Sequence, residues 1–260
     1  MPFVIATWNV NSIRARLHAL LPWLDRVGPD AVCLQETKVQ DHEFPIAAIE
    51  EAGYRAAYRG EKAYNGVAIL ARAPIENVRF GFDDDGPPDG ARLIIGEVSG
   101  VPIVNTYVPQ GRDVDHPMYA YKLEWFKRLL AFFDARFSPD EPLVWLGDLN
   151  VAPEPIDVWA PDRLLGHVCF NPEVAETLEA VKSWGFVDVF RTHAPDPGQY
   201  TYYDYRTLDG VAEGKGWRID HILATKSLAD RSTSTWIDLE PRRGERPSDH
   251  APLLAKFEIS

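Results

Sequence analysis

Short polar segments recur along the chain at the points where apolar, strand-like runs begin or end. The runs 3–6, 31–34 and 143–146 are each followed within three residues by carboxylate or amide side chains, and two further polar segments precede the runs that begin at Ile222 and Ala251. Strand ends that meet at one edge of a sheet are where α/β folds carry their chemistry. The pattern predicts an α/β fold whose polar residues converge on one site. The five polar segments are 8–11, 35–37, 147–150, 218–221 and 248–250.

The chain has the length and apolar content of a single domain spanning residues 1–260. Of its 260 residues, 45% are hydrophobic and eight are Trp, which is enough for a substantial core. The acidic run 83–90 is the nearest approach to a linker, and it is typical of a loop between strands. One domain is therefore the simplest interpretation.

The sequence predicts a protein of the reducing cytoplasm with no membrane association. No apolar run approaches the roughly 20 residues of a membrane span, and residues 1–4 run straight into a strand without the pattern of a signal peptide. The two cysteines, Cys33 and Cys169, do not make a disulfide framework. Cys33 lies in a strand-like run and is expected to be a small buried hydrophobe.

The net charge of −12 argues against indiscriminate binding to nucleic acid, which calls for a basic face. It leaves room for a nucleic-acid enzyme, because an acidic metal site adds negative charge and a local basic strip can still meet phosphates. The alternative is that most of these cations are scattered and solvated. Candidates for the strip are Arg14, Arg16, Lys38, Arg59, Lys62, Arg112, Lys122, Arg206, Lys215 and Arg218.

Apolar spacing places helices and strands in mixed order. Leucines from Leu17 to Leu24 follow helical spacing until Gly28 and Pro29 end the helix. This order predicts α/β with mixed sheets, and its hairpin-like pairs favour a two-sheet core with outer helices. Further helices are expected at 44–51, 117–137 and 173–184, and strands at 54–58, 67–70, 93–98 and 102–107.

Glu36 and Asp148 are the acidic residues best placed for metal and water chemistry. Glu36 ends a strand beside Asn9 and could hold Mg²⁺, which needs only one or two carboxylates; the alternative is an exposed loop Glu. Asp148 and Asn150 share one face of an extended segment, so one can accept a proton from water while the other donates to a phosphate oxygen. The alternative is an Asx turn.

His250 follows Asp249, and a carboxylate can fix the tautomer of an imidazole that donates to a phosphoryl oxygen. Asp220 is a second possible partner for His250, although His–Asp neighbours also arise by chance. His221 points to the opposite face of its strand and is expected to be structural. Tyr107, just before a turn, could bind phosphate or be an ordinary strand residue.

An aromatic cluster at 200–206 and the segment 215–218 interleave Tyr and Trp with Arg and Lys. This mixture suits stacking on bases or sugars beside phosphates. The alternative is an ordinary packed pair of strands.

Taken in order from residue 6 to residue 252, these segments closely resemble the exonuclease III family of apurinic/apyrimidinic endonucleases, part of the wider endonuclease/exonuclease/phosphatase superfamily. Any one segment is weak, whereas the ordered set is highly specific and covers essentially the whole chain. The matching segments are 6–14, 34–38, 107–111, 147–153, 204–206, 217–221 and 248–252.

The resemblance implies a four-layer α/β sandwich, in which two mixed sheets pack face to face between helices, and it implies residue roles. The metal site would involve Glu36 and Asp249 with Asn9 nearby, and would include Asp148 and Asn150. Asp148 would activate the attacking water, and His250, braced by Asp220, would stabilise charge on phosphoryl oxygens. Asn150 and Tyr107 would contact the scissile phosphate. The substrate-binding positions would be Asn11, Arg14, Lys38, Gln110, Tyr202, Trp217 and Ile219, the last three lining a pocket for a flipped-out abasic sugar.

The function implied is Mg²⁺-dependent cleavage of duplex DNA 5′ to abasic sites, with Mn²⁺ as an alternative ion. The products would carry a 3′-hydroxyl and a 5′-deoxyribose phosphate, and 3′→5′ exonuclease and 3′-end-cleaning activities would accompany the cut. The protein would be a monomer associated with the nucleoid.

The sequence departs from the family pattern in one place, because Tyr202 and Tyr203 stand where relatives usually carry Trp or Phe. The phenols add polarity to the pocket wall. The acidic loop 83–89 would repel DNA, so it is expected away from the binding face.

Two other functions compete with this reading. A non-catalytic nucleic-acid-binding relative would not need Glu36, Asp148, Asn150, Asp220 and His250 together. A phosphoesterase acting on a lipid headgroup, an inositol phosphate or RNA is disfavoured by segments 107–111 and 217–220.

Overall fold

The computed structural model describes residues 1–205 and 210–259. Arg206, one of the predicted basic-strip residues, lies outside them. Within the described part of the chain, no helix combines the length and hydropathy needed to cross a bilayer.

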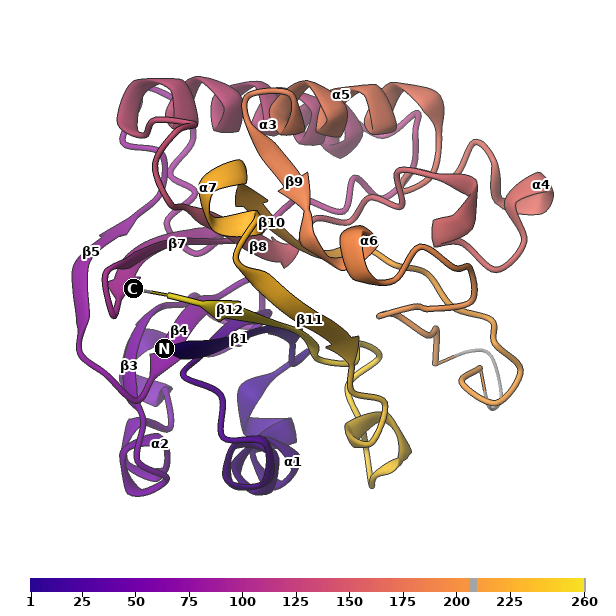
Figure 1. Ribbon diagram of the computed structural model, residues 1–260. Helices are drawn as coiled ribbons and strands as arrows, with labels where there is room; N and C mark the ends of the chain where they lie inside the picture. The colour runs from indigo at the N-terminus through magenta and orange to yellow at the C-terminus, as the bar shows by residue number, and fades with distance from the viewer. Residues whose placement is uncertain (206–209, 260) are drawn as a thin grey trace.

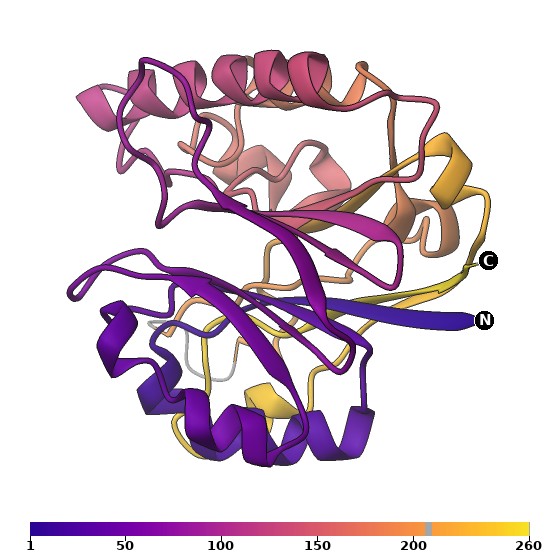
Figure 2. The same ribbon diagram turned by 90° about the vertical axis from the view of Figure 1, so that its left-hand side faces the viewer.

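Two mixed six-stranded sheets pack face to face (Figures 1 and 2). In each sheet one central pair of strands is parallel and the other pairs are antiparallel. The first sheet has the order β11 (Ser232–Ile237), β12 (Leu253–Glu258), β1 (Pro2–Asn9), β2 (Ala31–Gln35), β4 (Val67–Ala71) and β3 (Arg55–Arg59). The second has the order β5 (Ile75–Phe80), β6 (Leu93–Val98), β7 (Val101–Tyr107), β8 (Val144–Asp148), β10 (Asp220–Thr225) and β9 (Phe186–Asp188).

Helices cover the outer face of each sheet, which completes four layers. In Figure 1, α1 (Ile13–Val27) and α2 (Ile46–Glu51) lie below the first sheet, and α3 (Pro117–Arg136) and α5 (Pro172–Lys182) lie above the second. The predicted four-layer sandwich is confirmed. Short elements fill the connections: η1 (Asp41–Glu43), η2 (Pro155–Asp157), α4 (Pro161–Leu164), α6 (Val189–His193), α7 (Lys226–Ala229) and η3 (Pro241–Arg243).

Side chains alternate along the central strands between the inner core and the outer layers. In β8, Leu146 faces the other sheet while Trp145 packs under α3. In β1, Ile5 lies in the inner core while Trp8 packs under α1. Cys33 is fully buried in the inner core, which confirms its prediction as a small buried hydrophobe. Three apolar layers therefore hold the sandwich together.

Buried amides add directional contacts between the two sheets. Gln35 at the end of β2 donates through Nε2 to Asn105 Oδ1 in β7, at 2.7 Å. Asn105 Nδ2 in turn donates to the main-chain oxygens of Leu34 and Ala68 in the first sheet, at 3.0 and 2.9 Å. These bonds fix how one sheet lies on the other, which apolar packing alone does not.

The helix ends follow local capping chemistry. The long helix α3 begins after His116, whose Nδ1 accepts from the main-chain N of Met118, and Pro117 occupies its first turn. The helix predicted at 44–51 begins two residues late, because Phe44 and Pro45 belong to the turn that follows η1. The aromatic stretch 200–205 forms isolated bridges through Tyr202, to Trp217 and to His250, instead of a regular strand pair.

The acidic loop predicted at 83–89 packs against α3. Arg128 pairs with Asp84 and Asp89, and Arg136 pairs with Asp83. The negative charges of this loop are therefore largely neutralised by the two arginines of α3.

Gly147 permits the close parallel pairing of β7 and β8, so Gly147→Ala is expected to destabilise the protein by about 3 kcal/mol or more. Its φ is +142°, and an added Cβ would lie 1.9 Å from the main-chain oxygen of Thr106. Urea unfolding measures the change. The matched control is Gly100→Ala, which also has a positive φ but meets nothing within 4 Å. Equal losses in the two variants would contradict this account of Gly147.

Candidate active site

Strand register brings the polar segments to one end of the sandwich. Asn9 pairs with Gln35, the residue before Glu36, in the parallel β1–β2 ladder. Asp148 pairs with Tyr107 on one side and with Asp220 on the other. Residues more than 200 positions apart in the sequence also meet here. Ser248 Oγ donates to the main-chain oxygen of Asn9 at 2.7 Å.

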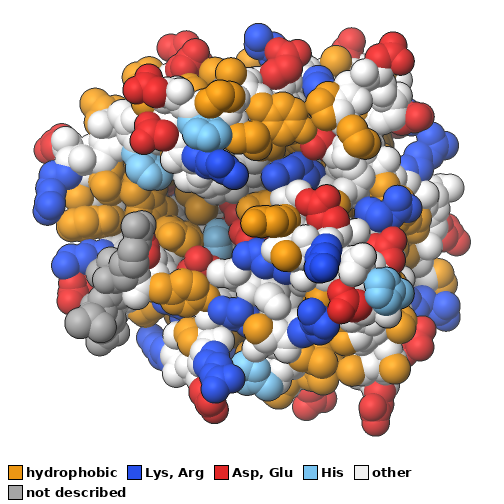
Figure 3. Space-filling model, turned by 180° about the vertical axis from the view of Figure 1, so that it is seen from behind, with side chains coloured by type: hydrophobic (Ala, Val, Ile, Leu, Met, Phe, Trp, Pro, Cys, Tyr) orange, Lys and Arg blue, Asp and Glu red, His pale blue; other side chains and the backbone are white. Residues whose placement is uncertain are grey.

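These side chains surround a pocket of about 530 Å³. On one face of the molecule, hydrophobic side chains gather around a hollow with Lys and Arg side chains near its edges (Figure 3). The predicted catalytic and metal residues that line the pocket are Glu36, Tyr107, Asp148, Asn150, Asp249 and His250. The predicted substrate-binding residues that line it are Gln110, Tyr202, Trp217 and Ile219.

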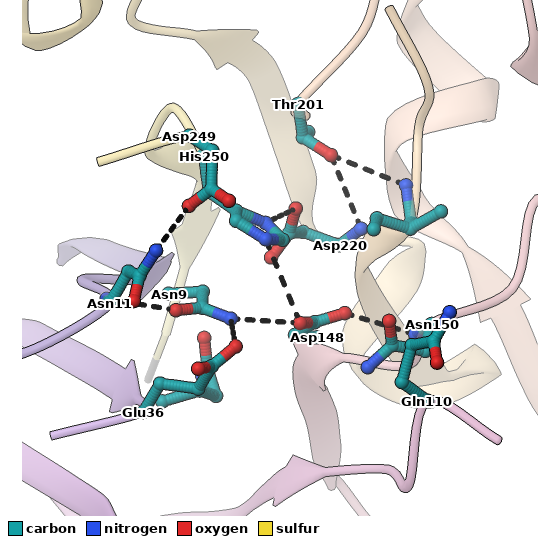
Figure 4. A network of polar contacts seen from close by, with 12 residues as sticks. Asn9, Asn11, Glu36, Gln110, Asp148, Asn150, Thr201, Asp220, Asp249 and His250 are labelled. Carbon is teal, nitrogen blue, oxygen red and sulfur yellow. Dashed lines mark hydrogen bonds and ion pairs between the residues drawn. The ribbon is translucent and has the colours of Figure 1, made fainter. Parts of the chain in front are cut away.

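A buried hydrogen-bonded row runs from Asp220 through His250 toward Asp148 (Figure 4). His250 Nδ1 lies 2.8 Å from Asp220 Oδ2, and its Nε2 lies 3.8 Å from Asp148 Oδ2. Thr201 Oγ1 accepts from the main-chain N of Asp220 at 3.2 Å. The imidazole is therefore oriented by Asp220 and presents its other nitrogen to the pocket.

The charges of this row make His250 a cation. Burial opposes its protonation, but Asp220 and then Asp148 outweigh burial and raise the pKa of His250 to about 10. Burial also raises the pKa of Asp148, to about 7. An imidazolium has two N–H donors and no lone pair for a metal. The ligand atoms of Asp148, Asp220 and His250 lie within 4.8 Å of one another, and while His250 is protonated it cannot serve as a metal ligand in this cluster.

Asn9 links carboxylates from the two sheets. Its Nδ2 donates to Glu36 Oε1 at 2.7 Å and to Asp148 Oδ2 at 2.9 Å. Its Oδ1 accepts from the main-chain N of Asn11 at 2.9 Å, which fixes the amide orientation. In this arrangement Asn9 orients the carboxylates of Glu36 and Asp148.

The oxygen donors on the Glu36 side of the pocket fit a hard divalent cation. Lys38 Nζ lies 2.6 Å from Glu36 Oε2 and donates to Asn11 Oδ1 at 2.6 Å, and Asn11 Nδ2 donates to Asp249 Oδ1 at 3.0 Å. Burial tends to raise the pKa of Glu36, but Lys38 and Asn9 lower it overall, so the carboxylate is ionised. The residues that would hold a metal are Glu36 and Asp249, which line the same pocket as Asp148.

Asp148 and Asn150 form the turn that the sequence left as an alternative, and both still face the pocket. The main-chain N of Asn150 donates to Asp148 Oδ1 at 2.9 Å, and Asn150 Nδ2 donates to the main-chain oxygen of Val108 at 3.0 Å. Asn150 has φ +53°, a conformation that Asn tolerates better than most residues. Burial keeps the pKa of Tyr107 well above its ordinary value, so its phenol remains a donor.

Comparison with known proteins places this arrangement in a family. A family model described as the endonuclease/exonuclease/phosphatase family matches residues 6–250. The chain belongs to the endonuclease/exonuclease/phosphatase family. Exodeoxyribonuclease III of Haemophilus influenzae is 31% identical over 263 residues, covering 96% of this chain and 98% of that protein. The predicted exonuclease III branch of the family, and with it the prediction of an enzyme, is confirmed.

Solved structures of this family share the fold closely. An AP endonuclease from Archaeoglobus fulgidus is 46% identical, with a TM-score of 0.97 over 99% of this chain and 100% of that one. A 3′ phosphatase from Neisseria, bound to a product DNA hairpin, is 35% identical, with a TM-score of 0.93 and the same coverage.

The aromatic wall of this exonuclease III-type pocket is built from main-chain pairing. Tyr202 and Trp217 exchange main-chain hydrogen bonds at 2.8 and 2.9 Å, and the Tyr202 ring lies 5.0 Å from His250. His167, which the sequence analysis missed, lies 4.8 Å from the Trp217 ring. Trp159 was missed as well, and Lys215 Nζ lies 5.6 Å from its ring. His167 and Trp159 both belong to the long connection after β8. The aromatic and His residues of this connection are the signal that could have marked it as part of the pocket.

Two residues proposed for the basic strip are buried instead. Arg218 is 1% exposed and pairs with Asp157 and Asp188. Lys122 is fully buried and donates to main-chain oxygens. The long side chains of Lys and Arg can be buried when every N–H donor finds an acceptor. Because both side chains are buried, neither Lys122 nor Arg218 lies on a surface that could face DNA.

Other predicted residues serve local contacts. Arg14 does not line the pocket; it lies on α1, half exposed, and pairs with Glu43 at 3.0 Å. Arg16 donates to the main-chain oxygen of Asn11 at 2.7 Å. His221 is structural, as predicted: its Nδ1 lies 3.0 Å from Arg218 Nη1 and its Nε2 lies 2.8 Å from the Val151 oxygen.

His250 should titrate near pH 10 when EDTA is present, as followed by NMR of its ring. The pKa of His250 is raised above its ordinary value of about 6.5. The folding stability that this residue contributes is therefore fully present below pH 6.5 and is lost as the pH rises through about 10. Asp220→Asn should lower this pKa and move the loss of stability to lower pH. Asp230→Asn, at an exposed pair with Lys226, is the control. A wild-type His250 that titrates near its ordinary value would refute the assignment.

Proposed function

We propose that this protein is a DNA-repair phosphodiesterase that cleaves duplex DNA 5′ to abasic sites. The proposal includes 3′→5′ exonuclease and 3′-end-cleaning activity, with a 3′-hydroxyl and a 5′-deoxyribose phosphate as products of the abasic cut. The observation that carries it is the pocket in which a cationic His250 and the carboxylate of Asp148 face the same space beside Glu36. The similarity to exodeoxyribonuclease III and to an AP endonuclease structure supports it.

The residues can divide the work of in-line hydrolysis between them. Asp148, whose pKa is raised by burial to about 7, can accept the proton of the attacking water near neutral pH. His250 carries a positive charge toward the position where the phosphoryl oxygens gain negative charge. Asp220 holds that imidazolium in place at 2.8 Å.

Tyr107 and Asn150 line the same space and can donate to the non-bridging oxygens. A bound Mg²⁺ or Mn²⁺, held by Glu36 and Asp249, would supply Lewis-acid stabilisation of the phosphoryl and leaving oxygens.

The pocket wall suits a sugar that has lost its base. Ile219 and the partly buried Tyr202 and Trp217 belong to one apolar cluster next to His250. Extruding a nucleotide costs least where no base has to be unstacked. The phenol of Tyr202 adds polarity to this wall, and Lys215 lies at the pocket edge as a cation for a neighbouring phosphate.

Removal of a 3′-terminal phosphate is a second candidate activity. It is favoured by the similarity to the Neisseria 3′ phosphatase, whose structure holds a product DNA hairpin. The same groups would serve it, because a phosphomonoester presents the same oxygens to Asp148 and His250. We further propose that the protein acts as a monomer in the reducing cytoplasm at the nucleoid, in keeping with its buried free cysteines, Cys33 and Cys169.

The deciding experiment is cleavage of a duplex with one tetrahydrofuran abasic analogue, beside an intact blunt duplex and a duplex with a 3′-phosphate. A single cut 5′ to the analogue that requires Mg²⁺ and is lost in EDTA is the expected result. Laddering of the intact duplex would establish the exonuclease activity. Absence of cleavage of all three by the folded protein would refute the DNA-repair function and favour a binding protein or a phosphoesterase for another substrate.

Asp148→Asn and His250→Ala should each lower kcat on the cleaved substrate by about 10³-fold or more, with DNA binding largely retained. The first variant loses the proton acceptor, and the second loses the positive charge. Asp140→Asn and His193→Ala, both exposed, are the matched controls and should keep wild-type turnover. Near-normal kcat in either active-site variant would remove that residue from its proposed role.

Glu36→Gln should weaken Mn²⁺ binding by at least about tenfold, as measured by calorimetry or electron paramagnetic resonance. The amide keeps the shape of the side chain but loses its charge. Glu43→Gln, whose carboxylate pairs with Arg14 on the surface, should bind Mn²⁺ like the wild type. Unchanged affinity in Glu36→Gln would place the metal elsewhere.

A further inference from the structure

Lys122 lies inside the protein and is bound mainly by main-chain oxygens, with Cys169 Sγ 4.0 Å from its Nζ. Its side chain is fully buried on α3. Nζ donates to the main-chain oxygens of Asn150 at 2.7 Å, Val168 at 3.0 Å and Gln110 at 3.2 Å. An ammonium has three donors, and burying it is costly unless each finds an acceptor. Here the three acceptors account for all three donors.

The three acceptors belong to three separate connections of the chain. Gln110 lies between β7 and α3, Asn150 lies between β8 and η2, and Val168 lies between α4 and α5. Each connection also supplies the pocket: Gln110 and Asn150 line it directly, and His167 and Cys169 flank Val168. One buried cation therefore touches three parts of the pocket rim at once.

Independent contacts hold the same connections close together. Gln110 Nε2 lies 3.8 Å from Cys169 Sγ. Gly111, with φ +96°, approaches Val168 so closely that an added Cβ would lie 2.7 Å from Val168 Cγ2. The connections are thus packed together around the point that Lys122 occupies.

We propose that Lys122 is a positioning residue of this active site, which holds Asn150 and the Gln110 and Val168 connections at one fixed spacing. The inference rests on the proposed function and extends it to a residue behind the pocket. The Asn150 oxygen is bound by Lys122, while its main-chain N donates to Asp148 and its side chain donates to Val108. Release of the oxygen would free Asn150 to move, and Asp148 would then lose a partner that orients it.

The expected effect follows from the geometry. An apolar side chain of similar length would fill the space but leave three buried oxygens without donors, so the connections would move toward water. A misplacement of about 1 Å in a catalytic constellation can cost about 10²-fold in rate. The loss should appear in kcat more than in KM, because the residue does not touch the substrate.

The test compares Lys122→Met with Lys127→Met, a control on the same helix whose side chain is 72% exposed. Two measurements are made on each: kcat and KM on the DNA that the wild type cleaves, and amide hydrogen exchange by mass spectrometry. Lys122→Met should lower kcat by about 10²-fold, keep KM within about threefold, and speed exchange in segments 108–113, 149–153 and 166–170. Lys127→Met should match the wild type in both.

A second variant carries the test if Lys122→Met does not fold. Gly111→Ala leaves Lys122 in place but forces the Gln110 and Val168 connections apart, so it should produce the same local exchange and the same loss of kcat. Folded Lys122→Met or Gly111→Ala with wild-type kcat would overturn the proposal. So would exchange that rises evenly over the whole molecule. A wild type that cleaves no DNA would refute the proposed function, whereas the exchange pattern would still decide the role of Lys122.

Discussion

The active site depends on the buried hydrogen bond between Gln35 and Asn105. The two sheets meet mainly through apolar side chains, whose attraction has no preferred direction. A hydrogen bond between amides in a dry interior does have one, and leaving either amide unpaired is costly. This bond, 2.7 Å long, lies one residue from Glu36 and two from Tyr107 in the sequence. It therefore sets the distance over which Asn9 can join Glu36 and Asp148.

An acidic protein with a net charge of −12 builds this site by burying cations among its carboxylates. His250 lies between Asp220 and Asp148, and Lys38 lies against Glu36. Arg218 neutralises Asp157 and Asp188 behind the strand that carries Asp220. The total charge thus says little about the local field, because each of these cations lies within a few ångströms of its carboxylates, where a poorly screening interior makes the attraction strong.

The sequence could predict the fold and the inner part of the site, because both follow from periodicity and strand ends. Asp148 and Asp220 lie opposite each other because Asp148 ends β8 where Asp220 begins the antiparallel β10, and both positions are visible as polar residues beside apolar runs. Lys122 was misplaced, because a lysine on a helix gives no sign that its acceptors, 12, 28 and 46 positions away, will enclose it. The aromatic and His content of the connection after β8 could have flagged His167, but only the folded chain shows that it lies beside Trp217.

The pairing of the first strand with the last has a consequence for the order in which this protein can fold. In β1, Pro2 lies opposite Glu258 of β12, and Thr7 lies opposite Leu253. Contacts between residues so far apart in sequence are slow to form. During synthesis the N-terminal strand can pair with β2, but its other edge stays open until β12 has left the ribosome. The site takes Asn9 from the first strand and His250 from the approach to the last, so a partly made chain has no complete active site.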